Sequence, residues 1–221
     1  FLNYPHMPTG QLPEFEQLKK VVEFARQNGI LIIHDNPYSF ILNANPTSLL
    51  ELDPEKETVI ELNSLSKSHN MSGWRVGMLI ASEQHINQVM RFKTNMDSGM
   101  FLPVQLAAAK ALTLEKQWYD DVNAIYQQRK IDALHLLDLL KCTYAANQVG
   151  LFVWARIPAT FSSGFDFSDE VLRKSKVFIT PGGIFGTTGD PFVRVSLCSK
   201  KEVLENAIER IKNSDLINNV E

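Results

Sequence analysis

An amphipathic helix pattern that leads directly into a short apolar segment constrains the fold of this chain most. Between residues 13 and 28 the apolar side chains fall at helical spacing, with Pro13 at the start and Gly29 just beyond the end. Residues 30–33 (ILII) then form a continuous apolar run that ends in the polar turn HDNP. A helix that feeds a fully apolar strand is half of a βαβ unit, so this segment predicts a buried parallel sheet.

The same alternation continues along the chain and then changes. It predicts strands at 58–62, 76–81, 150–156, 177–179 and 192–197, and helices that begin near Ser82 and cover 102–114, 118–140, 168–174 and 200–211. We place a boundary between residues 115 and 120. The pattern therefore predicts an α/β fold, with a doubly wound part at 1–117 and a smaller α+β domain at 118–221.

Composition excludes several classes of protein. The chain has 221 residues, 44% of them hydrophobic and 21% charged, as in a soluble globular protein. A net charge of −3 gives no basic surface for nucleic acid or an anionic membrane, and no apolar run is long enough to span a bilayer. Cys142 and Cys198 lack CxxC spacing, so we expect reduced, buried thiols in a cytoplasmic protein and no metal site.

The loop SLSKSHNMSGWRVG, between two apolar runs, holds the first group of candidate residues. Lys67 is of the type that forms a Schiff base with an aldehyde or ketone. Ser64, Ser66 and Arg75 offer hydroxyls and a guanidinium that suit a phosphate. The same residues also fit an ordinary solvated loop, in which His69 would be exposed, and both interpretations stay open at this point.

A second candidate group, Asp35 and Tyr38, follows the first predicted strand. Asp35 lies at the carboxyl end of a buried strand, where open α/β sheets bind ligands, and its carboxylate can pair with a cationic ring nitrogen. Tyr38 can hydrogen-bond a neighbouring oxygen of the same ligand. The alternative is that Asp35 only caps the turn that Asn36 and Pro37 make.

Arg194 interrupts the apolar strand FVRVSL. A buried arginine needs a partner, which would be either a substrate carboxylate held by two parallel hydrogen bonds or a local acidic side chain in a structural salt bridge. The segment Pro8-Thr9-Gly10 needs no function, since a turn before a helix accounts for it. The stretch GGIFG is not a dinucleotide-binding motif and indicates a loop that packs Phe185 near a site.

Taken together and in chain order, these motifs resemble the class I/II family of pyridoxal-phosphate-dependent aminotransferases of fold-type I. The resemblance covers essentially the whole chain, through NYPHMPTG, DNPY, SLSKSHNMSGWRVG, GLFVWARI and FVRVSL. It implies a partial three-layer αβα large domain with a mostly parallel sheet at 1–117, followed by a small α+β domain at 118–221. It also implies pyridoxal 5'-phosphate (PLP) as cofactor, amino-group transfer between an amino acid and a 2-oxo acid, and a homodimer.

The resemblance assigns roles to three residues that contact the reacting part of the cofactor. Lys67 matches the lysine that forms the Schiff base with PLP and then moves the proton at the substrate α-carbon. Asp35 resembles the carboxylate that keeps the pyridine nitrogen protonated, and the ring then acts as an electron sink. Tyr38 resembles the phenol that hydrogen-bonds the 3'-oxygen of the ring.

Five further residues match family positions around the phosphate and the substrate. Ser64, Ser66 and Arg75 match phosphate contacts, and Arg194 matches the arginine that binds the substrate α-carboxylate. Met7 stands where the family usually has an asparagine. Because a thioether cannot donate a hydrogen bond, Met7 is expected only to line the site.

Family members carry a substantial N-terminal part before the NYPHMPTG motif, including a phosphate-binding turn and much of the dimer interface. We therefore expect this chain to be the C-terminal portion of such an enzyme, with weak cofactor retention and low activity by itself. Two alternatives to the aminotransferase remain: a carbon–sulfur β-lyase on the same scaffold, or a non-catalytic truncated paralogue.

Overall fold

The computed structural model describes residues 1–216 and divides into two compact units. The first unit comprises Phe1–His6 and Leu12–Val122, and the second comprises Met7–Gln11 and the described chain from Asn123 onward. The division therefore falls five residues beyond the sequence-based boundary at 117 and assigns Met7–Gln11 to the second unit. It lies inside one continuous helix, α5, where no change in composition marks it.

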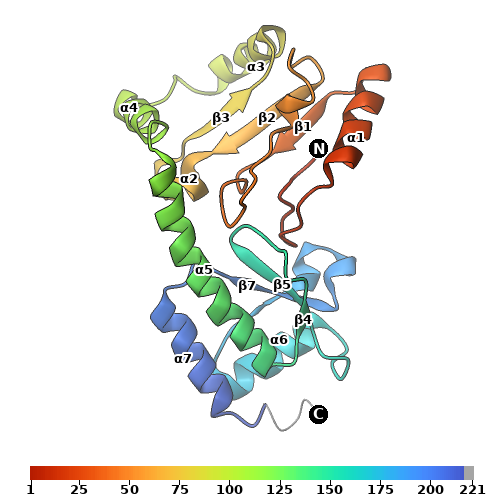
Figure 1. The fold of residues 1–221 in the computed structure, drawn as a ribbon, viewed down its shortest axis with the longest axis vertical. Coiled ribbons are helices and arrows are strands. Elements are labelled where there is room, and N and C mark those ends of the chain that lie inside the picture. Colours follow the sequence, from red (N-terminus) through yellow and green to blue (C-terminus); the bar gives the residue numbers. More distant parts are fainter. Residues whose placement is uncertain (217–221) are drawn as a thin grey trace. The chain divides into compact units, whose positions relative to one another are not determined.

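A three-stranded sheet organises the first unit (Figure 1). Strands β1 (Ile32–Asp35) and β2 (Val59–Ser64) are parallel, and β3 (Gly77–Ile80) is antiparallel to β2. Leu2 adds a parallel bridge to His34 on the outer side of β1. The sheet is therefore mixed. A parallel return needs a long crossover, and the segment between β2 and β3 forms only short helical turns, so β3 returns antiparallel.

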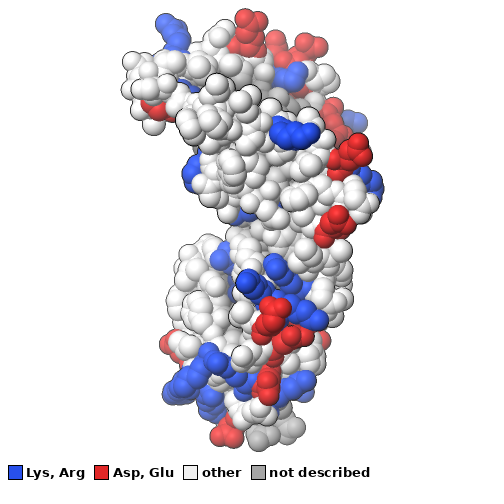
Figure 2. All heavy atoms as spheres, turned by 90° about the vertical axis from the view of Figure 1, so that its left-hand side faces the viewer, with Lys and Arg blue, Asp and Glu red and all other residues white. Residues whose placement is uncertain are grey.

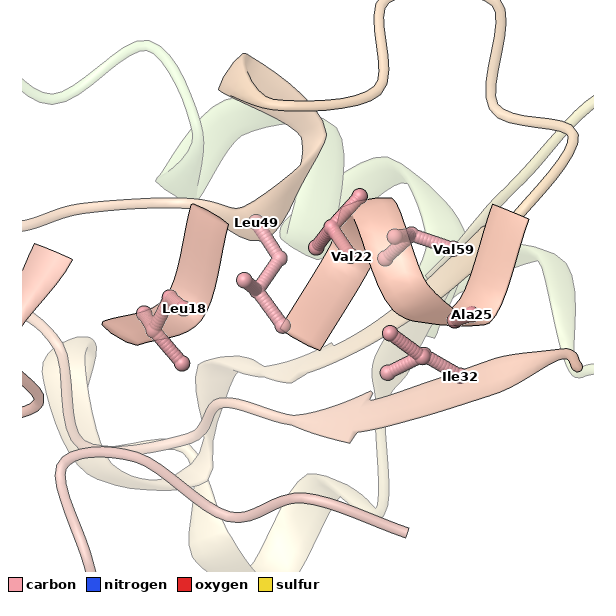
Figure 3. Packing of buried hydrophobic residues seen from close by; sticks show 6 residues of the cluster. All are labelled: Leu18, Val22, Ala25, Ile32, Leu49 and Val59. Carbon is pink, nitrogen blue, oxygen red and sulfur yellow. The ribbon is translucent and has the colours of Figure 1, made fainter. Parts of the chain in front are cut away.

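Helix α1 supplies one half of the core beneath this sheet. It spans Phe15–Gln27, and its buried face is Leu18, Val22 and Ala25. These side chains pack against Ile32 of β1 and Val59 of β2, and Leu49 of the short 3-10 helix η1 (Leu49–Glu51) completes the cluster (Figure 3). The cluster fixes the position of β1 and β2, and so of the strand ends that carry candidate residues.

Several apolar side chains are exposed on the remaining helices of the first unit. These helices are α2 (Leu65–Ser68), η2 (Ser72–Trp74), α3 (Glu83–Met96) and α4 (Leu102–Ala111). The exposed apolar side chains on α3, on α4 and between them include Phe92, Met96, Phe101, Leu102 and Leu106, with Phe101 73% exposed. Figure 2, seen from the side of α4, shows scattered charges of both signs over this unit and wide uncharged areas between them.

The second unit contains an antiparallel sheet with the strand order β4-β5-β7-β6. Helix α5 (Lys116–Leu139) runs into this unit. The other elements are β4 (Thr143–Tyr144), β5 (Phe152–Arg156), α6 (Gly164–Ser175), β6 (Thr180–Pro181), η3 (Gly182–Phe185), η4 (Thr187–Gly189), β7 (Phe192–Ser196) and α7 (Lys201–Lys212). Phe167 of α6 and Leu137 of α5 are fully buried in its core.

Three expectations about the second unit need correction. The strand expected at 177–179 forms instead at Thr180–Pro181, where β6 pairs with β7. Helix α6 begins at Gly164, earlier than residue 168, because the Ser163 hydroxyl accepts a hydrogen bond from the Asp166 amide at 3.1 Å. Both cysteines are free, but only Cys142 is buried; Cys198 is exposed.

Candidate active site

The carboxyl ends of β1 and β2 form one edge of the first unit's sheet. Asp35 ends β1 and Ser64 ends β2, and because the two strands are parallel these ends lie at the same edge. The Asp35 backbone is held on both sides, since its amide donates to the Leu2 carbonyl and its own carbonyl accepts from the Asn3 amide group, each at 2.8 Å. The Asp35 side chain is exposed at this edge.

Lys67 lies on α2, a single helical turn within a segment that the sequence predicted to be a loop. The turn forms because the Ser64 side chain accepts a hydrogen bond from the Ser66 amide at 3.1 Å and so caps its start. Leu65 anchors the turn in a core cluster with Met71, while Lys67 itself is only half-buried. The turn therefore holds Lys67 beside the sheet edge instead of leaving it on a solvated loop.

The side chain of Lys67 lies near the ring of Tyr38. The Lys67 ammonium nitrogen lies 6.0 Å from the centre of the Tyr38 ring, at the outer limit of a cation–π contact. Tyr38 follows Asp35 in the loop after β1, so this contact joins α2 to that loop. Among the described residues, no carboxylate forms an ion pair with Lys67.

His69 is buried, which corrects the expectation of a solvated loop histidine. Its Nδ1 lies 2.8 Å from the Ser68 hydroxyl, and its Nε2 lies 3.2 Å from the hydroxyl of Tyr119 on α5. Burial lowers the pKa of His69, and a hydrogen bond with the Ala111 backbone opposes this only in part. His69 is therefore a neutral, buried packing residue of the first unit.

Arg75 is brought back to the start of α2 by strand pairing. Gly77 pairs with Ser64, and the Val76 carbonyl accepts from the Leu65 amide at 3.4 Å. Arg75 itself adopts a left-handed conformation (φ 53°), and its exposed guanidinium donates to the Ser72 carbonyl at 2.9 Å. Gly77 is required here, because a Cβ would lie 2.8 Å from the Asn63 carbonyl oxygen.

The first unit thus brings six of the predicted site residues to one sheet edge: Asp35, Tyr38, Ser64, Ser66, Lys67 and Arg75. As a set of donors and acceptors they include a carboxylate, a phenol, an amine, two hydroxyls and a guanidinium. This set fits PLP, which has a basic ring nitrogen, a ring hydroxyl, an aldehyde and a phosphate. No group of three or more His, Cys, Asp or Glu side chains among residues 1–216 is placed to hold a metal ion.

Arg194 lies in the second unit, at the centre of β7. Its guanidinium carbon is 4.1 Å from the centre of the Phe152 ring and 4.5 Å from that of Phe185. The Phe185 ring also meets Trp154 edge-on, with 5.9 Å between centres, and Trp154 is directly opposite Arg194 in the sheet. Two aromatic rings therefore lie against the guanidinium, and its edge is the part suited to a carboxylate.

Met7 also lies in the second unit and is half-buried. Its segment is tied there by Gly10, whose carbonyl accepts from the Val149 amide at 2.9 Å. Gly10 has φ +67°, and a Cβ would lie 2.7 Å from the Val149 oxygen, so the close approach requires glycine. The Pro-Thr-Gly turn therefore has a structural role in this unit.

Sequence reasoning missed two residues that shape these sites. Phe152 has no role in the sequence-based prediction beyond its strand, although its spacing of two from Trp154 predicts that both face the same side as Arg194. Glu61 lies within the apolar run TVIEL, and an acidic residue in such a run requires a buried partner.

Comparison with known proteins agrees with this fold. Residues 1–211 match the family model described as aminotransferase class I and II. The LL-diaminopimelate aminotransferases of Dehalococcoides mccartyi and Halothermothrix orenii are each 37% identical to the chain, over 96% and 98% of its length. The apo structure of BacF from Bacillus subtilis superposes with a TM-score of 0.87 at 34% identity, over 96% of this chain and 55% of that one.

A second solved structure, an aromatic aminotransferase from Pyrococcus horikoshii, superposes with a TM-score of 0.86 at 28% identity, over 96% of this chain and 57% of that one. The fold and the site together define an α/β protein of the fold-type I group of PLP enzymes. The chain belongs to the class I and II aminotransferase family. It spans about half the length of the curated relatives it matches, 55% and 56% for the two named above.

Proposed function

We propose that the whole protein is a PLP-dependent aminotransferase that transfers an amino group between an α-amino acid and a 2-oxo acid. The observation that carries the proposal is the sheet edge of the first unit, where Lys67 and Tyr38 meet beside Asp35. An amine, a carboxylate and phosphate-binding groups at one edge are what this reaction needs from a protein.

Each residue at the edge would hold a different part of the cofactor. Asp35 would pair with the protonated ring nitrogen, and Tyr38 would hydrogen-bond the ring oxygen. The hydroxyls of Ser64 and Ser66 and the guanidinium of Arg75 would bind the phosphate. The Ser64 oxygen already accepts from the Ser66 amide, so its own proton remains for a phosphate oxygen.

Lys67 would carry the proton transfers. When bound, PLP supplies an aldehyde that condenses with amines and a ring that withdraws electrons from the substrate α-carbon. The Lys67 amine would take the proton from the substrate α-carbon and deliver it to the cofactor carbon that carried the aldehyde. The helical turn of α2 fixes the start of this side chain and so limits the region that the amine can reach.

Arg194 would bind the α-carboxylate of the amino acid through the edge of its guanidinium. The related proteins are named for different amino donors, diaminopimelate in one group and aromatic amino acids in another. The proposal therefore names the class of substrate, an α-amino acid and a 2-oxo acid. The names favour amino-group transfer over the β-lyase alternative, which would release ammonia and pyruvate without a 2-oxo acid.

We also propose a homodimer located in the cytoplasm. The exposed apolar side chains of α3 and α4 support an interface, since such surfaces on a monomer commonly mark protein contacts. The two free thiols, Cys142 and Cys198, support a reducing compartment. No helix among residues 1–216 has the length and apolar character that crossing a bilayer would require. Sedimentation of the whole protein distinguishes a dimer from a monomer.

The test of the function is a covalent trap. The protein is incubated with PLP, reduced with borohydride and digested, and the phosphopyridoxyl group is located by mass spectrometry. We expect the modification on the peptide that contains Lys67, at PLP concentrations too low to modify the other lysines. The Lys67→Ala variant should lose it, while Lys110→Ala, at an exposed lysine on α4, should keep it. Equal modification of many lysines would reject the proposal.

A further inference from the structure

Glu61 is a buried carboxylate that the proposed reaction does not use. It lies in the middle of β2, with its side chain only 5% exposed. One oxygen, Oε2, accepts three hydrogen bonds: from the Ser48 hydroxyl at 2.7 Å, from the Leu49 amide at 3.0 Å and from His34 Nδ1 at 3.2 Å. The other oxygen, Oε1, accepts from the Asn36 side-chain amide at 3.3 Å.

These contacts keep Glu61 ionised. Burial by itself would raise the pKa of Glu61, but the hydrogen bonds from His34, Ser48 and Asn36 and the charge of His34 together bring it below its ordinary value. Among the described residues, His34 is the only ionisable side chain that acts on Glu61. Glu61 is therefore a carboxylate that accepts hydrogen bonds and donates none.

His34 faces an acceptor at each of its two ring nitrogens. Nδ1 faces the Glu61 carboxylate at 3.2 Å, and Nε2 lies 3.0 Å from the Tyr4 backbone carbonyl oxygen. Neither oxygen carries a proton to donate. Both ring nitrogens must therefore donate, which only the positively charged imidazolium can do. His34 is also directly opposite Glu61 in the parallel pairing of β1 and β2.

The Glu61 carboxylate accepts hydrogen bonds from both ends of the loop that carries Tyr38. Asn36 begins the loop and contacts Glu61, and Ser48 and Leu49 end it on the same side chain. Asn36 also donates to the Thr47 carbonyl at 3.2 Å, which closes the loop on itself. A chain segment fixed at both ends by one buried group has few ways to move.

We propose that His34 and Glu61 form a buried imidazolium–carboxylate pair that fixes both ends of the loop at residues 36–49 and so positions Asp35 and Tyr38 for the cofactor. His34 and Asp35 are consecutive on β1, so their side chains point to opposite faces of the sheet. The pair therefore does not touch the cofactor. His34 and Glu61 are positioning residues.

The complete set of hydrogen bonds makes such a pair tolerable in a protein interior. Two buried charges are costly unless they are paired and their remaining polar atoms are satisfied. Here both oxygens of Glu61 and both nitrogens of His34 have partners at hydrogen-bond distance. Removing one charge leaves the other buried without compensation, so the charge state of His34 depends on Glu61.

The first experiment measures the charge of His34 directly in the unaltered chain. The protein is labelled with 15N-histidine, and the His34 signals are assigned with variants of the other four histidines. Because both ring nitrogens face acceptors, we expect both to carry a proton and to show imidazolium-type shifts. A spectrum in which one His34 ring nitrogen carries no proton would overturn the proposal.

The second experiment removes the charge of Glu61. In Glu61→Gln we expect one His34 ring nitrogen to lose its proton, and the Leu49 amide to exchange its proton at least about tenfold faster. Glu57→Gln, at an exposed position just before β2, is the matched control and should change neither signal. If Glu61→Gln leaves both His34 and the Leu49 amide unchanged, the pair does not hold the loop. Should this variant fail to fold, the wild-type spectrum still decides the charge state.

Only the role of Asp35 and Tyr38 as cofactor contacts rests on the proposed function. Trapping of PLP on Lys67 together with a neutral His34 would refute the ion pair and leave the aminotransferase proposal standing. An imidazolium signal from His34 without trapping of PLP on Lys67 would refute the aminotransferase proposal and leave the ion pair standing. The two failures are therefore distinguishable.

Discussion

The Lys67 ammonium lies 6.0 Å from the centre of the Tyr38 ring, and this relationship joins two segments that different elements hold in place. Lys67 is fixed by the capped turn of α2, and Tyr38 lies in the loop whose ends meet at Glu61. The distance between amine and ring therefore depends on two independent supports. Tyr38 can affect the cofactor site through its hydroxyl and through its ring, and substitutions can test these two effects separately.

Substitution of Tyr38 should separate these effects. Tyr38→Phe keeps a ring near Lys67 and removes only the hydroxyl. Because one hydrogen bond contributes about 0.5–1.5 kcal/mol, PLP affinity should fall roughly 2- to 12-fold while trapping on Lys67 continues. Tyr38→Leu, which also removes the ring, should bind more weakly still. Titration of PLP by absorbance measures both, and an unchanged affinity in Tyr38→Phe would remove the phenol from the cofactor site.

Removal of the Asp35 charge should affect activity far more than stability. Asp35→Asn keeps the size of the side chain but can no longer stabilise a protonated ring nitrogen. We expect turnover by the whole enzyme to fall about 10²- to 10³-fold, as when one preorganised electrostatic group is removed. The urea midpoint should hardly change, because the Asp35 side chain is exposed. Asp97→Asn, at an exposed aspartate paired with Lys93, is the control and should retain activity.

Local signals in the sequence predicted most of the elements. Ser82 was predicted to start a helix, and α3 begins at the next residue with the Ser82 hydroxyl accepting from the His85 amide. Helix α1 and strands β5 and β7 lie within a few residues of their expected bounds, since their apolar periodicity is strong. The short helix α2 was missed, because four residues are too few to show a helical period.

Features that depend on distant parts of the chain could not be predicted in the same way. His69 was expected in solvent, but Tyr119, fifty positions further on, covers it. The partner of Glu61 is set by strand register, which places His34 opposite it, and periodicity alone gives no register between two strands. The direction of β3 likewise depends on pairing with β2 and not on its own composition.

The aromatic side chains around Arg194 should control substrate affinity. Phe185→Leu removes one of the two rings that lie against the guanidinium. A cation–π contact contributes about 0.5–2 kcal/mol, so the KM for the amino acid should rise about 2- to 30-fold with little change in kcat. Phe178→Leu, at a phenylalanine 67% exposed, is the matched control. A fall in kcat at constant KM would show that the ring does not act through carboxylate binding.

Two phenylalanines on α6 offer a matched test of the second unit's core. Phe167 is fully buried, and its ring meets Phe161 edge-on at 5.0 Å between centres, whereas Phe165 is 45% exposed. Phe167→Ala should lower the free energy of unfolding by about 3–5 kcal/mol, and Phe165→Ala by less than about 1 kcal/mol. Urea denaturation of both variants measures the difference. Equal losses would mean that this part of α6 is not packed as described.

The two cysteines should differ sharply in reactivity. Burial, with a smaller contribution from the nearby Asp138 carboxylate, raises the pKa of Cys142 from 9.0 to about 12. A rise of about three pKa units lowers the thiolate fraction about 10³-fold at neutral pH, and the thiolate is the form that reacts. Cys198 is exposed. A thiol reagent at neutral pH should therefore modify one group per chain rapidly, and Cys198→Ser should abolish that phase.

The buried thiol of Cys142 should react only when the second unit opens. Because Cys142 is 6% exposed, the reagent must wait for local or global unfolding, so urea should accelerate this phase steeply. Raising the pH by one unit increases the thiolate fraction of Cys142 about tenfold but leaves the side chain covered, so pH should affect this slow phase less than urea does. In Cys142→Ala the slow phase should vanish while the fast phase stays. Two rapid thiols in the native protein would contradict the buried position of Cys142.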